Sequence, residues 1–269
     1  MPDRVGASCA APSELIYINW GPYAPPIIDT MNHDFRPGRD AHGANASTER
    51  LLAGMPLFTG LLDAEVRRWA GVATEMRVPR GGVVFRQGEP CAGLHVVVEG
   101  QIKLALENAR GDEKVIELIG PGSSFGETAL LLGEPHAMLA EAIADTVLIQ
   151  LGRDAVLEEV RRNADFSGRM LQAVCRRLAQ RTRDLESVTL HSGIQRVTAY
   201  LLLQLPDGVN GTPVAIRLPA KKSIIASRLN LTQEHFSRIL HEIQAAGLVR
   251  IRGREIEIRD VALLQAYPG

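Results

Sequence analysis

The stretch Lys221–Ala246, KKSIIASRLNLTQEHFSRILHEIQAA, has the pattern of two short helices joined by a tight turn. Apolar residues recur in its second half at i, i+3, i+4 and i+7, the spacing of one buried helical face: Phe236, Ile239, Leu240 and Ile243. Thr232 offers a side-chain oxygen to the free backbone N–H groups at the start of the second helix. Asn230 tolerates the left-handed backbone conformation that the turn requires. The stretch therefore predicts a helix-turn-helix.

The opposite face of the second helix carries polar side chains near its N-terminus. This is where a recognition helix meets base edges in the major groove. The residues that we expect to contact DNA are Thr232, Gln233, Glu234, Ser237 and Arg238, together with Lys221 and Lys222 at the start of the first helix. His235 and His241 are expected to face DNA or solvent. The alternative is an ordinary pair of surface helices whose polar face is in contact with water.

Two segments after the helix pair alternate between apolar and polar residues, as strands with one buried face do: 248–252 and 255–259. They flank Gly253-Arg254, so we expect a β-hairpin, and a helix-turn-helix followed by a hairpin is a winged helix. Residues 192–269 hold ten Lys or Arg and six Asp or Glu, a net charge of +4, whereas the whole chain has −1. The positive charge is concentrated where DNA phosphates would be met.

The preceding half of the chain has the pattern of an antiparallel β-roll. A helix is expected from Ser47 or Thr48 through Leu52, and a second one over residues 63–70. Short β-type segments follow at close spacing, separated by turns rich in Gly, Pro, Asn and Asp. We expect strands at residues 82–86, 93–99, 102–107, 114–119, 137–142 and 146–151.

Helical periodicity returns with a short helix over 154–162 and a longer one within 161–191. The longer helix carries a narrow apolar stripe with coiled-coil spacing, interrupted by one charged position, Arg181. Such a stripe typically pairs with a copy of itself, and a dimer would place two recognition helices about 34 Å apart, as a palindrome requires. The alternative is that the stripe packs on the β-roll. The residues expected at the dimer interface are Leu171, Val174, Leu178, Leu185 and Val188.

Four runs of residues resemble the Crp/Fnr superfamily of bacterial transcription regulators, in the order that the superfamily has them. LTQEHFSRIL at 231–240 is similar to its recognition helix, whereas FRQGEP at 85–90, GQIK at 100–103 and PGSSFGE at 121–127 look like its β-roll effector domain. The spacing Glu234-x-x-Ser237-Arg238 resembles the Fnr type, and the most similar branch is Dnr/Nnr, which regulates denitrification genes in response to nitric oxide. The resemblance implies a homodimer that binds a palindrome close to TTGAT-N4-ATCAA, with RNA polymerase as a partner.

The resemblance also places an effector pocket, at Gly126, Glu127, Thr128, Ala137 and Met138. In cyclic-nucleotide-binding members a Gly-Glu pair holds the ribose hydroxyls, and an Arg followed by Ser or Thr holds the cyclic phosphate. Here Ala137 and Met138 stand at the phosphate-binding positions and offer neither a charge nor a hydroxyl. We therefore expect that Glu127 anchors its loop and that cyclic AMP does not bind.

The Dnr-like resemblance implies haem as the sensor of nitric oxide, in an apolar pocket between the β-roll and the long helix. His191 at the end of that helix is a candidate iron ligand, and His95, His136 and Cys175 are others. Fnr itself holds an iron–sulfur cluster through closely spaced N-terminal cysteines. Only Cys9 lies in that region here, so we expect no such cluster.

Composition fits a modular protein of two domains, with aliphatic cores because only 4% of the 269 residues are aromatic. Three separated cysteines give no disulfide framework. No run of 18 apolar residues suggests a membrane span, and the N-terminus lacks a signal-peptide pattern. We therefore expect a cytoplasmic protein. The catalytic patterns G-x-S-x-G and H-E-x-x-H and the P-loop are absent, so no enzyme is expected.

These observations predict an α+β fold in four parts. Residues 1–49 are expected to be a disordered extension, 50–160 a β-roll effector domain, 161–191 a dimerisation helix and 192–269 a winged helix-turn-helix. The predicted function is an effector-controlled, sequence-specific regulator of transcription. The alternative is a cyclic-nucleotide-binding module that regulates a partner protein, with residues 192–269 as a protein-interaction domain.

Overall fold

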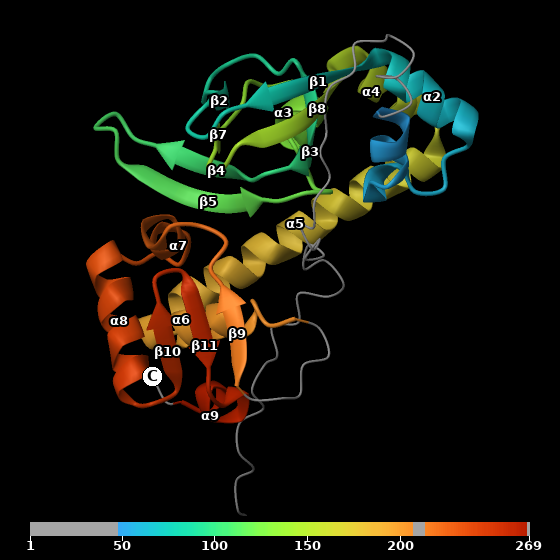
Figure 1. Cartoon of the computed structure of the whole chain (residues 1–269). Helices are drawn as coiled ribbons and strands as arrows, with labels where there is room; N and C mark the ends of the chain where they lie inside the picture. Colours follow the sequence, from blue (N-terminus) through green and yellow to red (C-terminus); the bar gives the residue numbers. More distant parts are fainter. Residues whose placement is uncertain (1–47, 207–212, 268–269) are drawn as a thin grey trace, which may run out of the picture.

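The computed structural model describes residues 48–206 and 213–267, which form a β-roll, a long helix and a C-terminal domain (Figure 1). The disorder expected for residues 1–49 lies outside the described residues except at Thr48 and Glu49, which belong to a helix over 48–53. Leu52 of this helix is fully buried and fixes the segment against the β-roll. Among the described residues, no helix has both the length and the apolar character needed to cross a membrane.

Two antiparallel four-stranded sheets face each other in the β-roll, with the strand orders β1-β8-β3-β6 and β2-β7-β4-β5. The strands are β1 Ala73–Val78, β2 Val83–Phe85, β3 Gly93–Glu99, β4 Ile102–Glu107, β5 Glu113–Ile119, β6 Ser124–Phe125, β7 Leu139–Ala142 and β8 Thr146–Gly152. The six expected strands are confirmed within two residues at each end.

Strands β1 and β6 were not expected from the sequence. In β1 only Val78 is buried, so its residues show little apolar alternation. The strand forms because its backbone pairs along β8, from Ala73 opposite Leu151 to Val78 opposite Thr146. Strand β6 has only two residues, Ser124 and Phe125, and pairs with β3. Backbone pairing with a neighbour thus adds strands that side-chain periodicity does not reveal.

Two apolar clusters stabilise the β-roll. The first lies between the two sheets and includes Val97, Leu104, Phe125 and Leu148. The second lies between one sheet and the surrounding helices, which are η2 Pro56–Phe58, α2 Asp63–Val72 and α4 Arg153–Arg162. Its centre is aromatic, because the ring of Trp69 lies 5.8 Å from that of Phe58 and 5.7 Å from that of Phe166. Phe166 belongs to the long helix, so this cluster attaches that helix to the β-roll.

Helix α5, Ala164–Leu190, runs from the β-roll to the C-terminal domain (Figure 1). It begins at Ala164 rather than at 161, because the side chain of Asn163 accepts a hydrogen bond from the backbone N–H of Phe166 and caps a new helix there. Its 27 residues span about 40 Å at the rise of an α-helix.

The C-terminal domain is a winged helix, as expected. Its helices are α6 Gly193–Leu202, α7 Lys222–Arg228, α8 Gln233–Ala245 and α9 Val261–Gln265, and its sheet has the order β10-β11-β9, with β9 Val214–Arg217, β10 Val249–Arg252 and β11 Glu255–Ile258. The predicted apolar face of α8 is confirmed, since Phe236, Ile239, Leu240 and Ile243 are all buried. Asn230 has φ 56° and is the one non-glycine residue with a left-handed backbone among those described. The turn between α7 and α8 therefore has the predicted form.

Candidate nucleic-acid interface and effector pocket

The N-terminus of α8 presents four polar side chains, which we call the recognition face: Gln233, Glu234, Ser237 and Arg238. Thr232 caps the helix by accepting a hydrogen bond from the backbone N–H of His235 at 3.2 Å. Gln233, Glu234 and Arg238 are exposed, and Ser237 is half-buried. Within the described part of the chain, the four side chains of the recognition face have no hydrogen-bond or ion-pair partner. The face is therefore free to bind another molecule.

Other basic residues lie around this face, but not all of them point outward. Lys221 is exposed and Lys222 is half-buried at the start of α7. In the wing, Arg250 and Arg252 are exposed. Arg254, at the tip of the hairpin, instead folds back and donates hydrogen bonds to the carbonyls of Leu218 and Pro219 at 3.1 and 3.3 Å.

The two histidines of α8, His235 and His241, have different surroundings. His235 is half-buried, because α6 begins close to α8. A Cβ atom placed on Gly193 would lie 3.1 Å from the Cδ1 atom of Ile239 and 3.3 Å from the Cε1 atom of His235. His235 therefore packs against the start of α6, whereas His241 is exposed.

The expected effector-pocket residues come together in one cavity of about 100 Å³ beside α5. Gly126, with φ 98°, begins the short helix α3, Glu127–Leu132, which the sequence did not predict. The cavity is lined by Phe85, Leu104, Gly126, Glu127, Thr128, Ala129, Glu134, Pro135, His136, Ala137, Met138 and Arg177. Arg177, from α5, is the residue that sequence reasoning missed. No local pattern distinguishes it from the other arginines of α5.

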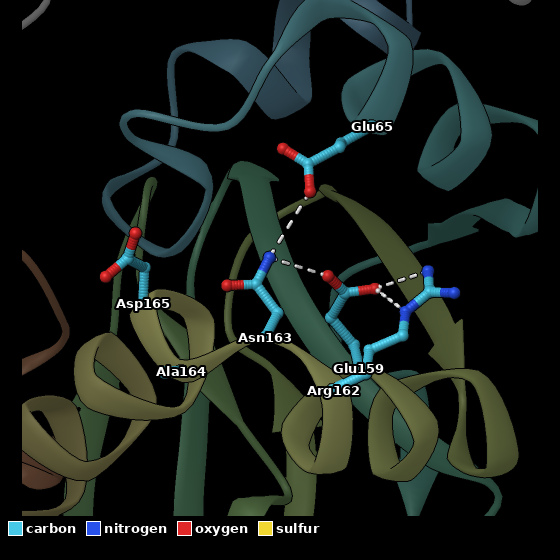
Figure 2. Close-up of a pocket in the computed structure, with 6 residues that line it drawn as sticks. All are labelled: Glu65, Glu159, Arg162, Asn163, Ala164 and Asp165. Atoms are coloured by element: carbon cyan, nitrogen blue, oxygen red, sulfur yellow. Dashed lines mark hydrogen bonds and ion pairs between the residues drawn. The ribbon is translucent and has the colours of Figure 1, made fainter.

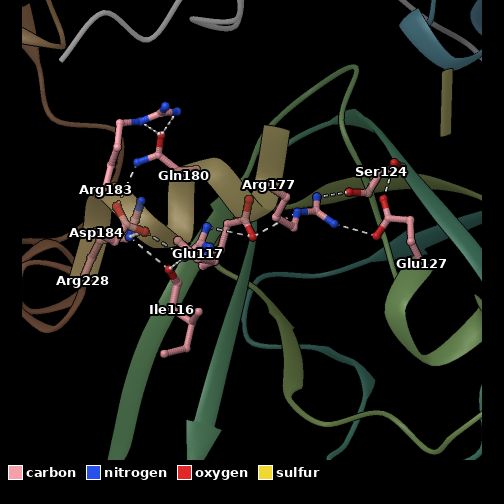
Figure 3. Close-up of polar contacts among 10 residues, drawn as sticks. Ile116, Glu117, Ser124, Glu127, Arg177, Gln180, Arg183, Asp184 and Arg228 are labelled. Atoms are coloured by element: carbon pink, nitrogen blue, oxygen red, sulfur yellow. Dashed lines mark hydrogen bonds and ion pairs between the residues drawn. The ribbon is translucent and has the colours of Figure 1, made fainter. Parts of the chain in front are cut away.

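Both carboxylate oxygens of Glu127 already have partners. Its side chain is only 3% exposed. The hydroxyl of Ser124 donates to Oε1 at 2.5 Å, and Nη1 of Arg177 lies 2.6 Å from Oε2 (Figure 3). Burial alone would lower the pKa of Arg177, but the charges of Glu127 and Glu117 outweigh it and the pKa is raised. These contacts favour the anchoring role of Glu127. Arg177 is the one Lys or Arg among the described lining residues, and it is already paired.

Two buried histidines lie beside the cavity among aromatic rings. The ring of His136 stacks on Phe85 at 3.5 Å, and that of His95 stacks on Phe125 at 5.1 Å. Burial, aided by the charge of His136, lowers the pKa of His95 to about 4, and burial also lowers the pKa of His136. Both imidazoles are therefore neutral at pH 7, and they form part of the core.

The described residues do not fit haem. His191 is the C-terminal cap of α5 and does not line the cavity, and Cys175 is exposed. The cavity of about 100 Å³ is far smaller than a porphyrin macrocycle. No group of three or more His, Cys, Asp or Glu side chains suited to a metal ion occurs among the described residues. The haem hypothesis thus gains no support from this geometry.

A larger hollow of about 380 Å³ lies at the junction of α4 and α5, and it shares no lining residue with the effector pocket (Figure 2). Its central group is the buried carboxylate of Glu159, which accepts hydrogen bonds from Arg162, Arg68 and Asn163. Burial would raise the pKa of Glu159, but its bonds to Arg162 and Asn163 and the charge of Arg68 lower it. Because these polar groups satisfy one another, the hollow is a structural joint between two helices.

An exposed apolar stripe runs along α5, and we call it the leucine stripe: Leu171, Leu178, Leu185 and Val188. The three leucines are 64%, 66% and 68% exposed, and the adjacent Val174 is half-buried. The alternative that the stripe packs on the β-roll is therefore wrong for these four residues. The expectation that Arg181 interrupts the stripe is also wrong, because its side chain turns toward β5 and lies 3.0 Å from Glu117.

Two family models match the chain: a cyclic nucleotide-binding domain over residues 75–163 and a Crp-like helix-turn-helix domain over residues 195–267. A cyclic AMP receptor protein of Thermus thermophilus is 31% identical over 214 residues, which cover 80% of this chain and 97% of that protein.

Solved structures share the fold. FixK2 of Bradyrhizobium japonicum superposes with a TM-score of 0.64 at 24% identity, covering 72% of this chain and 96% of that one. A Crp/Fnr-family transcriptional regulator of Thermus thermophilus gives a TM-score of 0.58 at 22% identity, with 72% and 97% covered. The chain therefore belongs to the Crp/Fnr family of transcription regulators.

Proposed function

We propose that the chain is a homodimeric, effector-controlled regulator that works in the cytoplasm and binds a palindrome close to TTGAT-N4-ATCAA. The observation that carries the proposal is the recognition face, whose polar side chains have no partner within the described residues. The guanidinium of Arg238 can donate two hydrogen bonds to a guanine, and the carboxylate of Glu234 can accept one from a cytosine amino group. Ser237 is short enough for a base to approach closely.

The leucine stripe supports a homodimer along α5. Leu171, Leu178 and Leu185 expose large apolar side chains in one row, and a second copy of the same row would cover them. Two-fold symmetry would then present two recognition faces to the two halves of a palindrome. The bound dimer would act on transcription through contact with RNA polymerase. We propose no catalytic reaction for this chain.

For the effector, we propose a small molecule other than cyclic AMP. Ala137 and Met138 offer a cyclic phosphate neither charge nor hydroxyl, and Arg177 is already paired with Glu127. Cyclic AMP bound here would lack one charge-assisted hydrogen bond and would still bear the cost of desolvating its phosphate anion, so its affinity would be low. The Dnr/Nnr resemblance implies nitric oxide read through haem, but the described residues around the cavity do not fit haem. A saturable Soret band on haem titration, shifted by nitric oxide, would overturn this poor fit and restore haem as the sensor.

The test is selection of bound sites from random double-stranded DNA by the full chain. We expect enrichment of the TTGAT-type half-site in inverted repeat. Calorimetry with millimolar cyclic AMP should give no binding heat, and saturable micromolar binding that raises DNA affinity would contradict the effector proposal. If no DNA site is enriched and the chain instead captures a partner protein, the alternative of a regulatory module acting on that protein replaces the proposal.

A further inference from the structure

The outer edge of strand β5 is covered by the first helix of the helix-turn-helix. Strand β5 is the last strand of its sheet, so one row of its backbone groups lacks a neighbouring strand. The N–H of Val115 donates to Oγ of Ser227 at 2.9 Å, and the ammonium of Lys114 donates to the carbonyl of Ser227. The carbonyl of Ile116 accepts from Nη1 of Arg228 at 3.0 Å. We call these bonds the α7–β5 contact.

Six charged side chains connect this contact to the effector pocket (Figure 3), and we call them the charged interface: Glu117, Glu127, Arg177, Arg181, Asp184 and Arg228. They form one continuous series of ion pairs, in which the nitrogen and oxygen atoms of successive side chains lie within 3.3 Å of each other. The successive distances are 2.6 Å from Glu127 to Arg177, 3.3 Å to Glu117, 3.0 Å to Arg181, 3.0 Å to Asp184 and 3.2 Å to Arg228.

The series is balanced in charge, with three guanidinium groups and three carboxylates. Arg181 also donates to the carbonyl of Ile116, the group that Arg228 contacts. Burial lowers the pKa of Arg181, and the charges of Arg228 and Arg177 add to this effect while Glu117 and Asp184 oppose it. Each carboxylate is thus needed to hold arginines that would otherwise repel one another.

We propose that Arg181, Asp184 and Arg228 are positioning residues that hold the helix-turn-helix against β5, and that Glu117 and Arg177 link this position to Glu127 in the effector pocket. The proposal deepens the proposed function and rests on it. Helices α7 and α8 share one core, in which Ile225 packs with Phe236, so the position of α7 sets the direction of the recognition face. A ligand that displaces Arg177 from Glu127 would change the first ion pair of the series.

The first test compares Asp184→Asn with Glu186→Gln, an exposed carboxylate on the same helix, in the full-length protein. Hydrogen–deuterium exchange at Val115 reports the α7–β5 contact without DNA. We expect Asp184→Asn to speed that exchange about tenfold, the effect of losing one charge-assisted hydrogen bond, and Glu186→Gln to leave it unchanged. Equal exchange in the two variants would overturn the positioning role.

DNA affinity supplies a second test, because the proposal and simple electrostatics predict changes in opposite directions. Both variants remove one negative charge, so electrostatics alone would make both bind DNA more tightly. We expect Asp184→Asn instead to bind the selected palindrome about tenfold more weakly than Glu186→Gln, because the recognition face is no longer held in one direction. Binding by Asp184→Asn that is as tight as that of Glu186→Gln would contradict the proposal.

The variant Glu127→Gln tests the link between the charged interface and the effector pocket, because Glu127 is the pocket residue at the end of the series of ion pairs. We expect faster exchange at Val115 in this variant, although Glu127 itself does not touch β5 or α7 in the contacts described. Faster exchange in Asp184→Asn but not in Glu127→Gln would overturn the link and keep the positioning role. If the parent protein binds no DNA, the proposed function fails, whereas the exchange measurements still decide whether the charged interface holds α7.

Discussion

The charged interface and the recognition face use the same residue types in opposite ways. In the charged interface, Arg181 and Glu117 lie 3.0 Å apart and are mostly buried, and each has further partners. On the recognition face, Arg238 and Glu234 are exposed and have no partner among the described residues. Residue type alone therefore does not distinguish arginines that pair within the chain from arginines that are free to bind another molecule. What separates them is whether the chain itself satisfies their hydrogen bonds.

The largest expected effect comes from a change in the leucine stripe. This stripe is exposed, as the recognition face is, but its side chains are apolar. Leu178→Glu would bury a carboxylate against its copy in the dimer, at a cost of several kcal/mol unless the helices separate. We expect sedimentation to show monomers and DNA binding to be lost. The exposed Glu186→Gln should remain dimeric. A persistent dimer of Leu178→Glu would place the interface elsewhere on the molecule.

The charged interface should respond to loss of an arginine as a folded core does. Arg177→Ala leaves the buried carboxylate of Glu127 without its cation, so we expect a loss of about 3 kcal/mol in the free energy of unfolding. Urea unfolding measures it. Replacing Glu127 by Gln in the same chain should recover part of the loss, because the buried charge is then removed as well. A loss below about 0.5 kcal/mol would place Arg177 with ordinary surface residues.

On the recognition face, replacing an arginine should reduce DNA affinity and leave folding stability almost unchanged. Arg238→Ala removes an exposed side chain without a partner in the chain, so unfolding should change by less than about 0.5 kcal/mol. Affinity for the selected palindrome should fall by about 1–3 kcal/mol, with a weaker preference for guanine. Fluorescence anisotropy on the parent site and on guanine-substituted sites separates the two effects. Unchanged affinity and selectivity would show that another residue reads the bases.

The smallest expected effect is the loss of folding stability at low pH. Burial lowers the pKa of His95 to about 4, below the ordinary value near 6.5, so protons bind the unfolded chain more tightly than the folded one. The stability contributed by neutral His95 is present above about pH 6.5 and is lost as the pH falls toward 4. We expect the free energy of unfolding to fall by about 1.3 kcal/mol between pH 7.5 and 5.5 from this group.

His95→Leu should flatten that part of the profile, whereas replacement of the exposed His241 should leave it in place. The measurement is urea unfolding at a series of pH values. An unchanged slope in His95→Leu would assign the acid sensitivity to other groups.

Local sequence patterns predicted the winged helix and most of the β-roll. The buried face of α8, the cap at Thr232 and the left-handed turn at Asn230 all follow from local rules, since each depends on residues within one or two turns of helix. The sequence also placed Glu127, Ala137 and Met138 in one pocket through their resemblance to a known family, and the structure brings them together.

The pairing of the charged residues depends on how the helices pack on the β-roll. Arg177, Arg181 and Arg228 look alike along the chain, but the packing of α5 and α7 against β5 gives each of them carboxylates or carbonyls that are distant in sequence. Strand β1 and the half-buried position of His235 likewise depend on a neighbouring strand and a neighbouring helix. Periodicity and capping are local, whereas ion pairing and edge-strand contacts depend on segments up to about a hundred residues apart, so local patterns do not contain them.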